Sequence, residues 1–148
     1  MAPANWKKKL KGLGLSRRRR APGTAPVPRP SVKRQRGDAG EEIATEFLEK
    51  RGLTVLERNV RYQDGELDVV ARNAATLVFV EVKRRRDAER GRAAEAVTPL
   101  KRARVVRAAR RWLAANPERR APDVRFDVIA IEDEPFRIDW IQGAFDAR

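Results

Sequence analysis

The chain of 148 residues contains no cysteine and no histidine. Without cysteine there is no disulfide framework and no thiolate metal site. Without histidine, an imidazole can act neither as a general base nor as a zinc ligand. Any metal that binds must therefore be held by oxygen, which favours a hard cation such as Mg²⁺ or Mn²⁺.

Long apolar runs are also missing. No segment approaches the roughly 20 consecutive apolar residues that are needed to span a bilayer. The N-terminus is basic, but no apolar stretch follows it as one would in a secretory signal. The sequence therefore predicts a cytoplasmic protein with no membrane partner.

Positive charge is distributed unevenly along the chain. Residues 1–36 carry 12 of the 34 Lys and Arg residues, five of the nine prolines and no acid, which predicts a disordered basic arm. Added phosphate affinity and a simple solvated tail both stay open as its role. Residues 37–148 hold the other 22 basic residues and all 21 acids, a net charge of +1, and are expected to form one domain. Within them, residues 83–111 concentrate 12 basic and 3 acidic residues.

The apolar periodicity predicts the element order α-β-β-β-α-β-β. Asp38 is expected to cap a first helix over about 39–51, and Thr98-Pro99 to open a second helix that runs to about Ala115. The five expected strands cover residues 54–61, 66–72, 76–83, 124–131 and 136–141. Short turns predict an antiparallel meander for the first three strands. The longer connection through the second helix permits a parallel fourth strand.

Charged residues interrupt two of these strands. The third strand is apolar on both faces until Glu81 and Lys83, which share one face because strand side chains alternate. On the second strand, Asp68 is expected on one face and Leu67 and Val69 on the other. Pairing of the two strands would bring Asp68 near Glu81. Two such carboxylates repel each other unless a divalent cation bridges them.

A phosphodiesterase needs such a set of residues. Carboxylates hold the cation against a phosphate oxygen, and an ammonium stabilises the developing charge. Glu41, expected in the first turn of the first helix, could add a third carboxylate. Each residue alone has a simpler explanation: a salt-bridged pair for Glu81 and Lys83, a strand-edge acid for Asp68, and a favourable helix-terminal charge for Glu41. Their combination points to a metal site.

A family resemblance supports this interpretation. Asp68, twelve further residues and then Glu81-Val-Lys83 resemble the PD-(D/E)-x-K nuclease motif, with Leu67 in place of its proline. The chain also resembles the bacterial YraN family over segments in nearly all of 37–148: Gly37-Asp-Ala-Gly-Glu41, Asn59-Val-Arg61, Gly65-Glu-Leu-Asp68, Phe79-Val-Glu-Val-Lys83, Ala96-Val-Thr98 with Lys101, Arg125-Phe-Asp127 and Ala144-Phe145.

The resemblance implies a restriction-endonuclease-like α/β fold, with a mixed sheet of about five strands flanked by helices, similar to archaeal Holliday-junction resolvases. It implies that Asp68 and Glu81 bind the metal, that Lys83 assists the attacking water, and that Glu41 is the matching acid of the N-terminal helix. Residues 37–148 would then be an endonuclease-like domain that binds nucleic acid.

Three functions stay open. The leading one is a Mg²⁺- or Mn²⁺-dependent nuclease that hydrolyses DNA, with branched or otherwise non-B DNA among its candidate substrates. The second is a catalytically silent nucleic-acid-binding protein of the same fold, and the third is a protein-interaction scaffold with a basic surface. The sequence leaves open DNA or RNA, and monomer or homodimer. The expected nucleic-acid contacts are all basic: Arg61, Arg84, Arg85, Arg86, Lys101, Arg104, Arg107 and Arg111.

Overall fold

The structure is a computed structural model that describes residues 32–87 and 97–147. The predicted basic arm lies outside these residues, apart from residues 32–36. The elements are α2 (Val32–Glu49), β1 (Thr54–Tyr62), β2 (Gly65–Arg72), β3 (Thr76–Asp87), α3 (Pro99–Ala115), the 3₁₀ helix η3 (Pro117–Arg119), β4 (Asp123–Glu134) and β5 (Phe136–Phe145). The predicted order α-β-β-β-α-β-β is confirmed.

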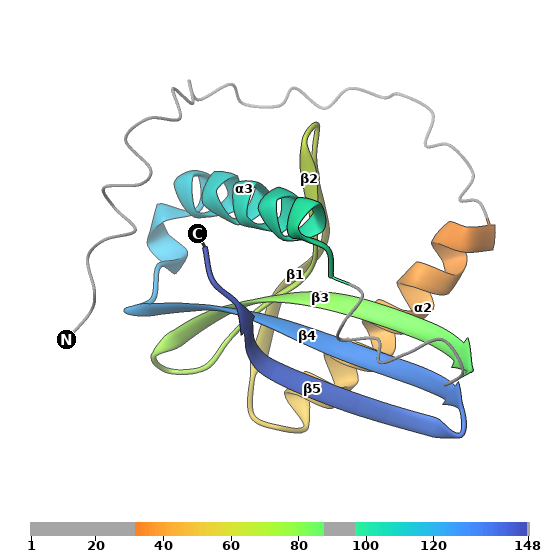
Figure 1. Cartoon of the computed structure of the whole chain (residues 1–148). Coiled ribbons are helices and arrows are strands. Elements are labelled where there is room, and N and C mark those ends of the chain that lie inside the picture. The colour runs from red at the N-terminus through yellow and green to blue at the C-terminus, as the bar shows by residue number, and fades with distance from the viewer. Residues whose placement is uncertain (1–31, 88–96, 148) are drawn as a thin grey trace, which may run out of the picture.

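The five strands form one mixed sheet in the order β1-β2-β3-β4-β5 (Figure 1). The neighbouring pairs are antiparallel except for β3 and β4, which run parallel and are connected along the chain through α3. The predicted meander and the parallel fourth strand are therefore both confirmed. Strands β3 and β4 extend beyond their predicted ends, because their ladder continues from Lys83↔Ala130 to Asp87↔Glu134.

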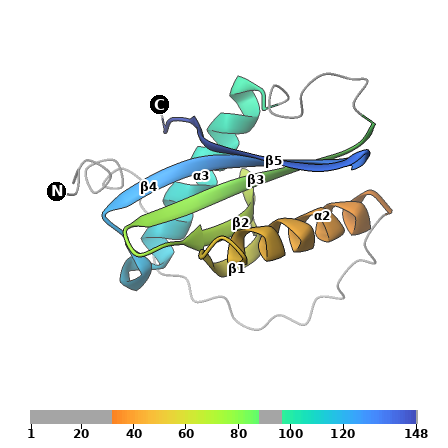
Figure 2. The ribbon, with the colours of Figure 1, turned by 90° about the horizontal axis from the view of Figure 1, so that it is seen from below.

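Each face of the sheet packs against one helix (Figure 2). On the α3 side, Leu77 and Phe79 of β3 are buried in a cluster that includes Trp112. On the α2 side, Val78 and Val80 are buried in a cluster that includes Leu48. Strand β3 is thus covered on both faces, as its continuous apolar run predicts. No helix within the described residues is long and apolar enough to cross a membrane.

The predicted start of the first helix is wrong. Helix α2 begins at Val32, so Asp38 lies inside it and is not its N-cap. Residues 33–36 are all strong helix formers and no proline follows Pro30 there, so nothing stops the helix from extending backwards. Glu41 therefore lies in the middle of the helix, where a favourable charge at a helix N-terminus no longer explains it. The second helix starts as predicted: the Thr98 hydroxyl accepts a hydrogen bond from the Lys101 N–H at 3.2 Å.

The β2–β3 ladder stops just before the predicted site. The pair at this end of the ladder is Val69↔Val80. Asp68, which precedes Val69, has no ladder partner on β3 and contacts that strand through its side chain instead. The Asp68 Oδ2 atom accepts a hydrogen bond from the Val82 N–H at 2.8 Å. Strand β2 therefore leaves β3 at Asp68.

Beyond this point the β1–β2 hairpin rises beside α3 (Figure 1). At its turn Gly65 lies directly against the helix: a Cβ atom there would lie 2.4 Å from the Arg104 carbonyl oxygen. Leu67 is consequently buried in the cluster on the α3 side, whereas Val69 belongs to the cluster on the α2 side. The prediction that Leu67 and Val69 share a face is wrong, because the hairpin leaves the plane of the sheet between them.

Candidate active site

Three acidic residues from three elements share one electrostatic environment where β2 leaves β3. Glu81 of β3 is 2 % exposed, Glu41 of α2 is 6 % exposed, and Asp68 of β2 is partly buried. The pKa of Asp68 is raised well above its ordinary value, first by burial and then by the negative charge of Glu81. The hydrogen bond from Val82 opposes this shift, and Glu41 adds to it. The hydrogen bond from Val82, the residue next to Glu81, brings Asp68 close to Glu81, as the strand pairing predicts.

Glu41 reaches this environment from the opposite face of the sheet. Helix α2 packs closely on the end of β3, because a Cβ atom on Gly40 would lie 3.6 Å from the Arg84 Cβ and 3.7 Å from the Val82 Cγ1. The Thr45 hydroxyl donates a hydrogen bond to the Glu41 carbonyl oxygen at 2.8 Å. Glu41 is thus a buried acid on the α2 side of the site.

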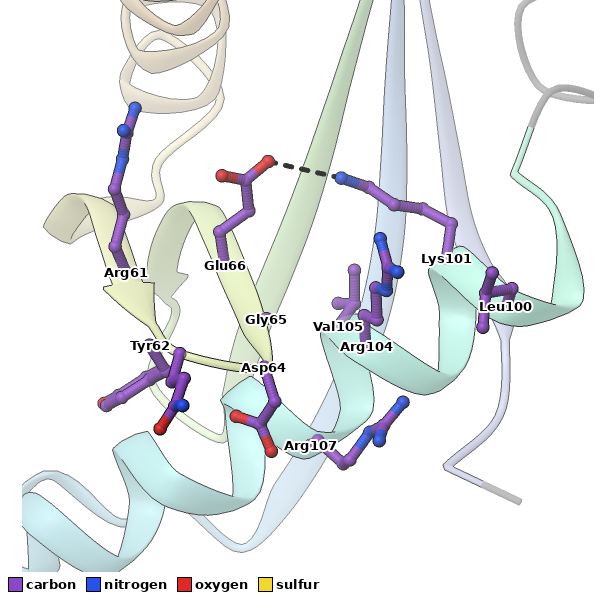
Figure 3. Close-up of a pocket in the computed structure, with 11 residues that line it drawn as sticks. Arg61, Tyr62, Asp64, Gly65, Glu66, Leu100, Lys101, Arg104, Val105 and Arg107 are labelled. Atoms are coloured by element: carbon purple, nitrogen blue, oxygen red, sulfur yellow. Dashed lines mark hydrogen bonds and ion pairs between the residues drawn. The ribbon is translucent and has the colours of Figure 1, made fainter.

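Two lysines neutralise part of this negative charge. The Lys83 Nζ lies 3.2 Å and the Lys101 Nζ 3.4 Å from the same atom, Glu81 Oε1. Lys101 also lies 3.3 Å from Glu66 Oε1 (Figure 3). Burial alone would lower the pKa of Lys101, but the carboxylates of Glu81, Glu66 and Asp68 outweigh it and raise that pKa above its ordinary value. The site is thus a network of carboxylates and ammonium groups.

The donor atoms fit an open site for a hard cation. Glu81 Oε2 is buried and has no hydrogen-bond partner among the described residues. All the candidate ligands are carboxylate oxygens, the donors that Mg²⁺ prefers. Within residues 32–87 and 97–147, no group of three or more acidic side chains is arranged so that it could hold a metal ion. Mg²⁺ commonly takes only one or two protein carboxylates and completes its shell with water and phosphate, so a pair such as Asp68 and Glu81 is compatible with such a site.

A basic cleft adjoins the acids. It lies between the β1–β2 hairpin and α3 and has a volume of about 520 Å³ (Figure 3). Four of the eight predicted nucleic-acid contacts line it: Arg61, Lys101, Arg104 and Arg107. Glu66 lines it too, so the pair that Glu66 forms with Lys101 belongs both to the cleft and to the acidic site.

The structure does not gather the other predicted contacts into this cleft. Arg111 binds Asp64 at the hairpin turn, with 3.1 Å between Nη2 and Oδ2. Arg84 pairs with Asp133 at 3.0 Å and lies against α2, on the opposite face from Lys83. Because strand side chains alternate, Arg86 lies on the same face of the sheet as Arg84, and Arg85 on the same face as Lys83. The basic residues of the following loop, 88–96, lie outside the described residues.

Sequence reasoning missed two features of the site. Glu66 was not a predicted site residue, although its place two positions before Asp68 on the same strand was a usable signal. Lys101 was predicted only as a phosphate contact. Its position among the acids depends on how α3 packs against the hairpin, which no local sequence pattern reports.

Comparison with known proteins identifies the family. The model of Uncharacterised protein family UPF0102 matches residues 40–131, a stretch that includes Glu41, Asp68, Glu81, Lys83 and Lys101. A UPF0102 protein of Vibrio cholerae is 46 % identical over 112 residues, which cover 75 % of this chain and 92 % of that protein. A UPF0102 protein of Ralstonia nicotianae is 47 % identical over 124 residues, covering 81 % and 93 % respectively. A UPF0102 protein of Beutenbergia cavernae is 54 % identical over 95 residues, covering 64 % and 80 %.

The family match covers α2 from Gly40 onward, the whole of α3, and all the acidic and lysine residues of the site. The predicted resemblance is thereby confirmed: the chain belongs to the UPF0102 family, which is the YraN family.

Proposed function

We propose that this protein is a Mg²⁺- or Mn²⁺-dependent nuclease that hydrolyses DNA phosphodiester bonds at Asp68, Glu81 and Lys83. The observation that carries the proposal is the burial of Glu81, one oxygen of which has no hydrogen-bond partner among the described residues. Beside it lies Asp68, whose pKa is raised by burial and by the charge of Glu81. Buried carboxylates that repel one another are costly. A divalent cation between them would remove that cost.

The residues divide the chemistry between them. Asp68 and Glu81 would hold the cation, which when bound polarises the phosphorus and lowers the pKa of a bound water. Lys83 lies 3.2 Å from Glu81 Oε1, and 28 % of its side chain is exposed. Its ammonium is therefore within reach of both the acids and an incoming phosphate, where it can orient the attacking water and stabilise negative charge. Glu41 strengthens the negative field from behind.

The basic cleft would guide the nucleic acid to these residues. Arg61, Arg104 and Arg107 place guanidinium groups along it, and Lys101 joins it to the acidic site. Contacts between guanidinium groups and phosphate position a nucleic acid without reading its bases. We therefore expect structure-selective rather than sequence-selective cleavage, with branched or otherwise non-B DNA among the substrates.

One observation favours a second candidate function, a nucleic-acid-binding protein without turnover. Lys83 and Lys101 both contact Glu81 Oε1, so part of the acidic charge is already compensated within the protein. In that case the cleft would bind phosphate and the acids would serve only to hold the two lysines in place.

Cleavage assays on a panel of substrates separate the two functions. The full-length protein is incubated with linear, flapped and four-way DNA, and with single-stranded DNA and RNA, in Mg²⁺, Mn²⁺ or EDTA. We expect cleavage that needs the cation and that Asp68→Asn abolishes. The matched control is Asp133→Asn, which removes a carboxylate paired with Arg84 on the other side of the sheet. Salt-dependent binding without cleavage in any cation would support the second function, and undiminished cleavage by Asp68→Asn would refute the site.

A further inference from the structure

Lys101 occupies an unusual position for a lysine on a helix surface. It lies in the first turn of α3, where its backbone N–H donates to the capping Thr98 hydroxyl. From there its side chain reaches across to two strands, with Nζ 3.4 Å from Glu81 Oε1 on β3 and 3.3 Å from Glu66 Oε1 on β2. Only 26 % of the side chain is exposed. Lys101 therefore links α3 to both strands that carry the proposed metal ligands.

This position places Lys101 in competition with any cation at the site. Its ammonium contacts the same Glu81 oxygen as Lys83 does. A divalent cation held by Asp68 and Glu81 would lie close to both ammonium groups, and like charges at such distances repel strongly where water is scarce. One of the two lysines must then withdraw.

The geometry favours the withdrawal of Lys101. Lys83 is two residues from Glu81 on the same strand, so its backbone position relative to that acid is fixed. Lys101 is on a different element, has a second partner in Glu66, and lines the cleft that also contains Arg104 and Arg107. Lys83 is not among the residues that line that cleft. A displaced Lys101 ammonium can therefore keep its contact with Glu66, which also lines the cleft, and its positive charge makes that cleft more attractive to an anion.

We infer that Lys101 is a resident counter-ion of the acidic site, which a divalent cation must displace from Glu81 and which then faces a phosphate in the cleft. The inference rests on the proposed metal site and adds a coupling to it. Cation binding and phosphate binding should each strengthen the other, because both favour the same displaced position of one ammonium group.

Direct measurement of Mn²⁺ binding tests this inference without any activity assay. Free Mn²⁺ is followed by electron paramagnetic resonance during titration of the full-length protein, of Lys101→Met and of Lys101→Gln. Without its competitor the site should bind Mn²⁺ about tenfold more tightly in both variants, within the usual range of couplings between sites. The control is Arg102→Met, which removes the neighbouring positive charge of α3. That guanidinium donates to the Val97 carbonyl oxygen and not to the acids, so the Mn²⁺ affinity should not change.

A second titration tests the coupling itself. Inorganic phosphate should tighten Mn²⁺ binding by the wild-type protein and should have a much smaller effect on Lys101→Met and Lys101→Gln. Mn²⁺ affinities in the folded variants that equal or fall below that of the wild type would overturn the inference and leave the metal site standing. Absence of Mn²⁺ binding in every protein at millimolar concentration would overturn the proposed metal site, and this inference with it.

Discussion

Replacing Asp68 by Asn should have opposite effects on function and on stability. The variant loses a proposed metal ligand, and with it cation-dependent cleavage. Without divalent cations, however, we expect its free energy of unfolding at neutral pH to exceed that of the wild type. An Asn side chain can still accept the hydrogen bond from the Val82 N–H, but it removes the charge that burial, Glu81 and Glu41 all disfavour.

The pH dependence gives this effect its sign and its limit. The pKa of Asp68 is raised above the ordinary value of 3.8, so the folded protein keeps a proton that the unfolded chain has released. The stabilisation that this retained proton gives the folded wild type is fully present below about pH 3.8. It is lost as the pH rises through the raised pKa of Asp68. One retained proton limits the slope to about 1.4 kcal/mol per pH unit. The advantage of Asp68→Asn should therefore grow across this window and become constant above it.

Urea unfolding in EDTA across a series of pH values measures this difference. The control is Asp139→Asn, which breaks an exposed ion pair with Arg137 and should change stability by less than about 1 kcal/mol. Addition of Mg²⁺ should then stabilise the wild type by mass action and leave Asp68→Asn unchanged. If Asp68→Asn were no more stable than the wild type and followed the same pH slope, the Asp68 charge would already be fully compensated within the protein. The acidic site would then have no need of a cation.

Three further variants test the hairpin packing, a buried carboxylate of β4 and the cleft. Gly65→Ala places a Cβ atom 2.4 Å from the Arg104 carbonyl oxygen, so thermal denaturation should show that the free energy of unfolding falls by about 1–3 kcal/mol. DNA affinity should also fall, because the hairpin moves away from α3. An unchanged melting temperature would contradict this packing. Asp127→Asn alters a fully buried carboxylate that accepts four hydrogen bonds. Urea unfolding should show that the free energy of unfolding falls by about 3 kcal/mol or more. A fall of less than about 1 kcal/mol would show that the charge of Asp127 is not needed. Charge reversal at both Arg104 and Arg107 should weaken DNA binding and flatten its log–log salt dependence by about 0.9 for each phosphate that is no longer neutralised; titrations at several salt concentrations that superimpose on those of the wild type would exclude the cleft as the DNA path.

Local sequence patterns were sufficient to predict the order and pairing of the elements. The continuous apolar run of β3 predicts a central strand that is covered on both faces. The structure confirms it, since the adjacent residues Val78 and Phe79 are buried on opposite faces of the sheet. Thr98 with the following proline locates the start of α3. The short turns require antiparallel neighbours, and the approach of Asp68 to Glu81 follows from that pairing. These predictions succeed because hydrogen-bond geometry and side-chain periodicity act over a few residues.

Other features of the site depend on contacts between elements that are distant in the sequence. The early start of α2, and with it the mid-helix place of Glu41, was missed because helix formers there outweigh the expected cap at Asp38. The departure of β2 from β3 depends on a hydrogen bond between Asp68 and Val82, fourteen residues apart. The placement of Lys101 on Glu81 depends on the packing of α3 against the hairpin at Gly65. The sequence thus determined which charged residues interrupt the strands and the order in which they follow one another. Only the tertiary structure decided which charges meet, because those distances arise from long-range packing.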